Sequence, residues 1–224
     1  MGQFCELRVV NWAAILVSDI DGSQQSFGHA AEEEAIPAAV RRRMGRLERL
    51  AVRCAFGVLD DKPTGELVFC SRYGNVETLA LLLRGIADGQ LMSPMAFSCS
   101  VHNATPGFVG QIRKERIGHT ALAAGAGTFS AGLIESYARL VSDDCEDVTL
   151  IFADLALPEL YDEFEDEDAP GLAMAIRLER AEEDAAATPL TVGPGRRGAL
   201  DVLDGLRSGT VRLDLGEGVT CSMA

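Results

Sequence analysis

The sequence predicts a layered α/β fold on three observations. Short runs of β-branched and apolar residues alternate with longer segments whose apolar residues recur at helical spacing, which is typical of strands alternating with helices. Hydrophobic residues make up 47% of the 224 residues, so the chain can enclose a substantial core. Ala and Gly are in surplus while aromatic residues are only 6%, a composition that favours closely packed layers.

The first predicted elements are a buried strand and a long helix. Residues 8–20 (RVVNWAAILVSDI) are a β-branched and apolar run typical of a strand, and the polar residues 21–34 are expected to form a loop. Pro37 suits the first turn of a helix, and the following segment AAVRRRMGRLERLAVRCAFGVL is predicted to be helical. The apolar stripe of this helix is predicted from residues at helical spacing, namely Val40, Met44, Leu47, Leu50, Ala51 and Cys54.

The middle of the chain continues the alternation. Residues 60–64 (DDKPT) predict a turn, and residues 93–97 (SPMAF) are expected to be extended, because proline disfavours the helical conformation of the residue before it. Further apolar runs predict strands at residues 66–70, 120–124, 148–155 and 170–180. Periodic segments predict helices at residues 76–86, 103–111 and 128–141, and charged residues predict an acidic loop at 161–168.

The pattern weakens after residue 181. Residues 182–198 are typical of a loop or linker, residues 199–209 of one short helix, and residues 211–219 of a short strand. We expect residues 1–182 to form one domain and residues 183–224 to form a C-terminal extension that packs on it.

Charge and cysteine usage argue against several classes of function. The formal net charge of −14 repels the phosphates of nucleic acids and anionic lipid surfaces. No run approaches the roughly 18–20 apolar residues of a membrane span, and the N-terminal residues resemble a first strand more than a secretory signal. The six cysteines and three histidines show no metal-ligand spacing. We therefore expect a cytoplasmic protein with free thiols and no metal or cofactor.

Residues 120–140 contain the most informative pattern, which is a short apolar strand, a Gly-rich turn and a helix. Such a turn can present a nucleophile, or it can bind phosphate with the N–H groups at the start of the helix. The turn residues have no side chain that can attack an acyl group, and the sequence lacks the lysine of a phosphate-binding loop. We expect no covalent catalysis at these residues, which are Ala124, Gly125, Ala126 and Gly127.

Three other groups of residues have both a functional and a structural interpretation. Cys99 and His102 suggest the nucleophile and base of an acyltransferase or thioesterase, or a pair that packs in the core or lines a tunnel. The acidic residues between 154 and 168 lack the pattern of a calcium loop, which favours a solvated loop. Two basic clusters are either docking sites for an acidic partner or solvated helix faces, namely Arg41, Arg42, Arg43, Arg113, Lys114 and Arg116.

Several fragments resemble the N-terminal half of β-ketoacyl synthases, which belong to the thiolase-like superfamily. These fragments are ELVFCSRYGN, LMSPMAFSCSVHNATPGFVGQ, HTALAAGAGTFSAGLIESYARL, VTLIFADLALPELY and DEDAPGLAMAIRLERAE, and IPAAVRRRMGRLERLAVRCA fits the family's early helix. SRYG and SPMAFSCSVHNATPG most resemble a short subgroup of chain-length-factor-like proteins from aryl polyene and related type II fatty acid or polyketide systems. The resemblance spans about residues 36–182.

The resemblance implies a thiolase-like α/β/α fold in the form of an N-terminal half. It places the family's nucleophilic cysteine at or next to Gly125, whereas the nearest cysteines are Cys99 and Cys145. The two catalytic histidines of the family's second half have no counterpart in the printed sequence, which contains no HGTGT-like segment. The resemblance therefore implies a protein that lacks the family's catalysis.

The function implied is that of a non-catalytic subunit. It would form a heterodimer with a full-length β-ketoacyl synthase, help to shape or close the acyl tunnel, and meet the acyl carrier protein. A homodimer that holds an acyl chain without turning it over is a further alternative. The residues expected at the tunnel or interface are Met95, Phe97, Val101, His102 and Phe108, with Thr120, Ala121, Leu122 and Ala123 as the pairing strand.

Overall fold

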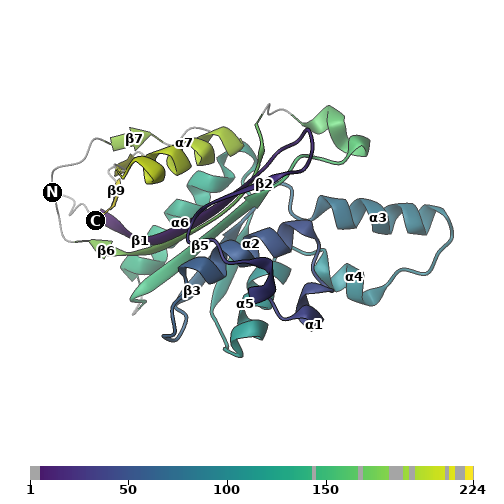
Figure 1. Cartoon of the computed structure of the whole chain (residues 1–224), viewed down its shortest axis with the longest axis horizontal. Helices are drawn as coiled ribbons and strands as arrows, with labels where there is room; N and C mark the ends of the chain where they lie inside the picture. Colours follow the sequence, from purple (N-terminus) through teal and green to yellow (C-terminus); the bar gives the residue numbers. More distant parts are fainter. Residues whose placement is uncertain are drawn as a thin grey trace.

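One mixed sheet with helices on both of its faces forms the protein (Figure 1). The computed structural model describes residues 6–142, 145–165, 169–181, 189–191, 195–209, 212–214 and 220–223. Across the described residues the strands lie in the order β4-β3-β5-β6-β1-β9-β8-β7, and β2 pairs with β1. The predicted α/β class is confirmed.

The main strands agree closely with the predicted ones. They are β1 (Glu6–Val17), β3 (Glu66–Cys70), β4 (His119–Leu122), β5 (Asp147–Asp154) and β6 (Gly171–Ala181). β6 runs antiparallel to both β1 and β5, while β3 is parallel to β4 and β5. The carboxyl ends of β1, β3, β4 and β5 therefore meet at one edge of the sheet, and this edge carries the candidate site.

The sheet separates two apolar cores, because side chains of a strand alternate between its faces. On β5, for example, Leu150 and Phe152 join one core while Ile151 and Ala153 join the other. The helices α6 (Thr128–Ser142) and α7 (Gly195–Ser208) cover the first core. The second core is covered by α2 (Arg46–Val58) and α5 (Ala104–Arg113). The result is a helix–sheet–helix sandwich.

The long helix predicted after Pro37 is two helices, so that prediction was wrong in its continuity. A short α1 (Ala38–Arg41) is followed by α2, which begins after the extended residue Gly45. A Cβ atom at Gly45 would lie 2.7 Å from a carboxylate oxygen of Glu48, so the tight entry into α2 needs glycine here. The predicted apolar stripe is confirmed, because five of its members are buried: Met44, Leu47, Leu50, Ala51 and Cys54.

Two further local predictions were wrong. Residues 93–97 belong largely to the helix α4 (Pro94–Cys99), in which Pro94 occupies the first turn and the Ser93 hydroxyl accepts a hydrogen bond from the Ala96 N–H. Proline needs no hydrogen-bonded N–H at that position, so it starts this helix instead of preventing it. Within the loop predicted at residues 21–34, β2 (Gln24–Gly28) folds back against β1 as a hairpin.

The remaining elements complete the sandwich. α3 (Val76–Ala87) follows β3, the short 3₁₀ turns are η1 (Glu33–Ala35), η2 (Gly125–Gly127) and η3 (Glu159–Phe164), and the far edge holds β7 (Pro189–Thr191), β8 (Arg212–Asp214) and β9 (Thr220–Met223). η3 overlaps the first half of the acidic loop predicted at residues 161–168, of which residues 166–168 are outside the described residues. α7 buries Val202, Leu203 and Leu206 in the first core and contacts α6. The division at residue 182 stays a prediction.

In the part of the chain that is described, no helix is both long and apolar enough to cross a membrane. Four cysteines have described side chains, Cys54, Cys70, Cys99 and Cys145, and all four are free thiols.

Candidate functional site

The Gly-rich turn connects the edge strand β4 to the buried helix α6. The turn is organised by Thr128, whose hydroxyl accepts a hydrogen bond from the Ala124 N–H at 2.9 Å and donates one to the Gly125 carbonyl at 2.7 Å. Gly125 has φ +58°, a conformation that favours glycine. Ala123 to Gly127 are exposed, and a Cβ atom at Gly125 or Gly127 would meet nothing within 4 Å. The turn therefore has a shape that could present a reactive side chain to solvent, but its residues are all alanine or glycine and have no side chain that can react.

The strand before this turn ends the sheet. β4 pairs with β3 through residues 119–122 and has no second neighbour among the described strands. Thr120, Ala121 and Leu122 are half-buried, while His119 and Ala123 are exposed. An unpaired strand edge is a template on which the strand of another chain can pair. The exposed turn and the open edge thus form one continuous feature.

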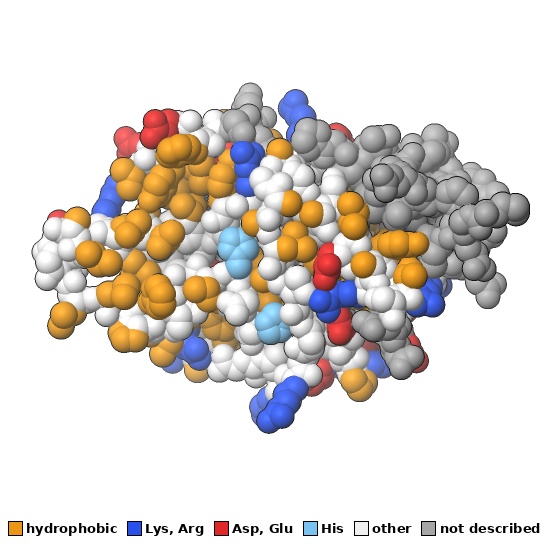
Figure 2. Space-filling model, turned by 180° about the vertical axis from the view of Figure 1, so that it is seen from behind, with side chains coloured by type: hydrophobic (Ala, Val, Ile, Leu, Met, Phe, Trp, Pro, Cys, Tyr) orange, Lys and Arg blue, Asp and Glu red, His pale blue; other side chains and the backbone are white. Residues whose placement is uncertain are grey.

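A second surface, formed by α3, α4 and the segments next to them, carries exposed apolar side chains. Only Ala80 of α3 is buried, and Leu91 in the following loop is 100% exposed. Figure 2 shows hydrophobic side chains gathered over the end of the molecule that α3 and α4 form, on the face seen from behind. We call this surface the α3–α4 face, and its exposed members are Leu79, Leu81, Leu83, Ile86, Leu91, Met92, Met95, Phe97 and Val101. A patch of this extent marks an interaction surface.

Three of the nine predicted tunnel and interface residues lie on this surface. Met95, Phe97 and Val101 are exposed on the α3–α4 face. Phe108 is different, because it is 4% exposed and packs in the second core, with the Arg43 guanidinium 5.7 Å from its ring centroid.

Cys99 and His102 are not joined by a hydrogen bond. Cys99 is 4% exposed in the second core. The His102 Nε2–H donates to the carbonyl oxygen of Ser71 at 2.9 Å, and its ring meets that of Phe69 edge-on. His102 therefore holds the turn after β3, and the geometry gives no support to a nucleophile–base pair.

The turn after β3, residues 71–75, is held by the carboxylate of Asp154, which is 2% exposed, so the prediction that places Asp154 in a solvated acidic loop was wrong. Asp154 at the end of β5 accepts hydrogen bonds from the Ser71 hydroxyl at 2.8 Å and from the N–H groups of Arg72 and Tyr73. Burial raises the pKa of Asp154 to about 6, against the lowering effect of these hydrogen bonds. An acidic residue at the end of an otherwise apolar strand was the available signal.

A second buried carboxylate supports the same turn from α2. The Asn75 side chain donates to Glu48 at 2.6 Å and caps α3 by accepting from the Thr78 N–H. Burial raises the pKa of Glu48 as well. The turn that starts α3 is thus fixed by β5, α2 and His102 together, which gives the projecting α3 a rigid base.

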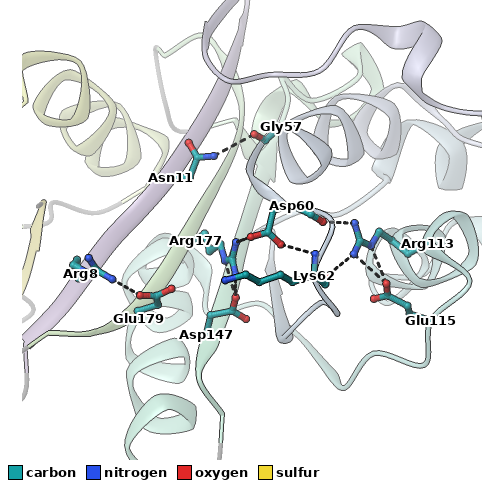
Figure 3. Close-up of polar contacts among 10 residues, drawn as sticks. All are labelled: Arg8, Asn11, Gly57, Asp60, Lys62, Arg113, Glu115, Asp147, Arg177 and Glu179. Atoms are coloured by element: carbon teal, nitrogen blue, oxygen red, sulfur yellow. Dashed lines mark hydrogen bonds and ion pairs between the residues drawn. The ribbon is translucent and has the colours of Figure 1, made fainter.

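The two basic clusters differ in structure. In Figure 3 the Arg113 guanidinium donates to the backbone carbonyls of Asp60 and Lys62 and pairs with Glu115, so Arg113 fastens the loop before β3. Beside it, Arg177 pairs with Asp60 and Asp147. Among the other cationic residues of the clusters, Arg41 bonds the Glu33 carbonyl, whereas Arg42, Arg43, Lys114 and Arg116 are exposed. The exposed members remain candidates for docking.

A mixed sheet between helix layers, with a strand–turn–helix at its edge, defines an α/β protein of the thiolase-like class. The family model for the N-terminal domain of β-ketoacyl synthases matches residues 18–197, and the chain therefore belongs to the β-ketoacyl synthase family through that domain.

Solved structures share this fold. The ketosynthase (ApeO) in complex with its chain length factor (ApeC) from Xenorhabdus doucetiae matches with a TM-score of 0.75 and 22% identity, over 93% of this chain and 94% of that chain. The ishigamide ketosynthase/chain length factor matches with a TM-score of 0.60 and 12% identity, over 80% of this chain and 63% of that chain. A β-ketoacyl synthase from Burkholderia phymatum STM815 matches with a TM-score of 0.58 and 12% identity, over 79% and 59%. Curated proteins gave no match.

Proposed function

We propose that this chain is a non-catalytic, chain-length-factor-like subunit that forms a heterodimer with a full-length β-ketoacyl synthase. The observation that carries the proposal is the turn at Gly125. It keeps the strand, the glycine of positive φ and the buried helix, but presents no nucleophile. A fold that retains the architecture of a nucleophile turn without its side chain is suited to assembly instead of covalent chemistry.

Two exposed features support a protein partner. One is the open β4 edge before the turn, and the other is the apolar α3–α4 face. Burial of apolar surface stabilises an interface by about 25 cal/mol per Å² before the costs of association. The choice of partner is supported by the similar structure from Xenorhabdus doucetiae, which is a ketosynthase in complex with its chain length factor.

Within this assembly we assign a steric role to the α3–α4 face. Met95, Phe97 and Val101 would close the far end of the ketosynthase's acyl tunnel, so that their bulk limits the length of the acyl chain. The exposed Arg42 and Arg43 would meet an acidic acyl carrier protein. The setting would be aryl polyene-type fatty acid or polyketide biosynthesis in the cytoplasm.

Co-purification with a full-length ketosynthase of such a system tests the assembly. An affinity-tagged chain should retain the untagged ketosynthase through size-exclusion chromatography. Leu83→Glu or Phe97→Asp should abolish this, because either places a charge on the α3–α4 face. Leu160→Asp is the matched control, because Leu160 is equally exposed but lies on η3. A stable homodimer that ignores the ketosynthase would overturn the proposal.

The steric role has its own measurement. In the assembled complex, Phe97→Ala should shift the products toward longer acyl chains, while Leu160→Ala should leave the distribution unchanged. Identical product lengths from the wild type and Phe97→Ala would remove the tunnel role without affecting the proposed heterodimer.

A further inference from the structure

Three arginines on one face of α2 line a cavity whose walls include no residue of the Gly125 turn. Arg46, Arg49 and Arg53 are spaced three and four residues apart, which places them along one helix face. Together with Gln24, Glu33, Leu50 and Glu77 they line a cavity of about 290 Å³. Three arginines against two glutamates leave the lining of this cavity net positive, in a chain whose net charge is −14.

Neutral backbone carbonyls hold these guanidinium groups in place. Arg46 donates to the Gly22 carbonyl at 3.0 Å, Arg49 to the Gly45 carbonyl at 3.3 Å, and Arg53 to the Ala31 carbonyl at 2.8 Å. Arg53 is 8% exposed, so its position is fixed. A carbonyl orients a guanidinium without cancelling its charge, and each guanidinium has further N–H donors to offer.

Carboxylates neutralise this charge only in part. Arg49 is paired with Glu33 at 3.6 Å, and Glu33 is shared with Arg41 at 3.9 Å. Among the described residues, neither Arg46 nor Arg53 has a carboxylate oxygen within 4.0 Å. Glu77 lines the same cavity without pairing with Arg46. The three cations therefore face one shared carboxylate and one unpaired carboxylate.

A second cavity adjoins the first, because Arg46 and Glu77 line both. It measures about 280 Å³ and lies between the turn after β1, the end of β5 and the start of α3. Its wall includes Val17, Leu47, Leu155 and Leu157, with Asp19 as a further acidic member. The start of α3 adds the positive end of a twelve-residue helix. A cationic cavity thus borders a partly apolar one.

We propose that this pair of cavities binds a small phosphate monoester, with the phosphate among Arg46, Arg49 and Arg53 and an apolar group in the adjoining chamber. Guanidinium groups match phosphate oxygens in pairs of parallel hydrogen bonds. A small molecule is favoured over a phosphorylated protein because each chamber is the size of a small-ligand site. The site lies outside the proposed dimer surface and stands independently of the proposed function.

Calorimetric titration with n-hexyl phosphate at low ionic strength tests the site. Hexyl phosphate should bind more tightly than inorganic phosphate, because only the ester fills the apolar chamber. Arg46→Gln and Arg49→Gln should each weaken binding about tenfold or more, as expected for lost charge-assisted hydrogen bonds. Glu77→Gln should tighten binding, because it removes the unpaired negative charge.

The controls separate this site from general attraction to positive charge. Arg84→Gln removes an exposed arginine of α3 outside both cavities and should leave the affinity unchanged. Arg49→Lys keeps the charge but loses the planar fork, so it should bind more weakly than the wild type and more tightly than Arg49→Gln. The proposal is overturned if the folded wild type does not bind millimolar hexyl phosphate, or if the Arg46→Gln and Arg49→Gln variants bind it as the wild type does.

Discussion

Ser71 donates its hydroxyl hydrogen to Asp154 across the carboxyl ends of β3 and β5, with an oxygen–oxygen distance of 2.8 Å. The same hydroxyl accepts a hydrogen bond from the Gly74 N–H at 2.7 Å. Both residues are buried, and their bond closes the turn that carries α3. Because α3 and α4 hold the apolar face proposed for assembly, this bond links the core of the sheet to the candidate interface.

Ser71→Ala should destabilise the protein by about 1–3 kcal/mol. The change leaves the buried Gly74 N–H without an acceptor and Asp154 with one donor fewer, and unsatisfied buried polar groups cost roughly this amount. Urea unfolding monitored by circular dichroism measures the free energy of unfolding. Ser98→Ala is the control, because Ser98 is exposed and bonds only within α4. Equal stability of Ser71→Ala and Ser98→Ala would contradict the role of the bond.

Asp154 should make the protein less stable as the pH rises from about 4 to about 6. Its pKa in the folded state is raised from 3.8 to about 6 by burial, so the folded state keeps a proton that the unfolded state has lost in this window. The resulting stabilisation, about 2–3 kcal/mol, is complete below pH 3.8 and is lost as the pH passes 6. Unfolding free energies of the wild type and Asp154→Asn across this range measure it. The contribution is refuted if the two proteins show the same pH dependence.

This carboxylate also shows what the sequence alone could and could not predict. Strands and helices are predicted from apolar runs and helically spaced stripes, whose residues lie close together in the sequence. For this reason β3, β5, α3 and α6 were predicted nearly to their ends. Asp154 and Ser71 are separated by 83 residues, and their contact follows from the pairing of β3 with β5. No local pattern contains that information.

The local errors have equally specific causes. Pro94 was interpreted as a helix breaker, but Ser93 caps a helix in which the proline occupies the first turn. The break before α2 depends on close approach between Gly45 and Glu48, which is a tertiary contact. The strand–turn–helix of the candidate site could be predicted because it is contiguous, whereas the α2 arginine cavity could not, because β2, η1 and α3 complete its walls.

Gly74→Ala should be more destabilising than Gly89→Ala. Both glycines have positive φ, +64° and +72°, so alanine strains the backbone at either position by about 1–2 kcal/mol. Only at Gly74 would the added Cβ also meet a side chain, at 2.6 Å from the His102 ring, whereas at Gly89 it meets nothing within 4 Å. We expect a further 1–3 kcal/mol, roughly the cost of overpacking, for Gly74→Ala. Chemical denaturation compares the two variants, and similar losses would show that His102 yields without cost.

A last pair of glycine substitutions tests how closely α6 packs on the sheet. A Cβ atom at Gly132 would lie 2.6 Å from the Cys70 Sγ and 2.9 Å from Leu150, both in the first core. Gly132→Ala should therefore destabilise the protein by about 1–3 kcal/mol through overpacking. Gly107 in α5 has nothing within 4 Å of its added Cβ, so Gly107→Ala should stabilise by about 0.5–1 kcal/mol through helix propensity. Thermal unfolding of the two variants should move in opposite directions, and a stabilising Gly132→Ala would mean that α6 lies farther from β3 than the structure places it.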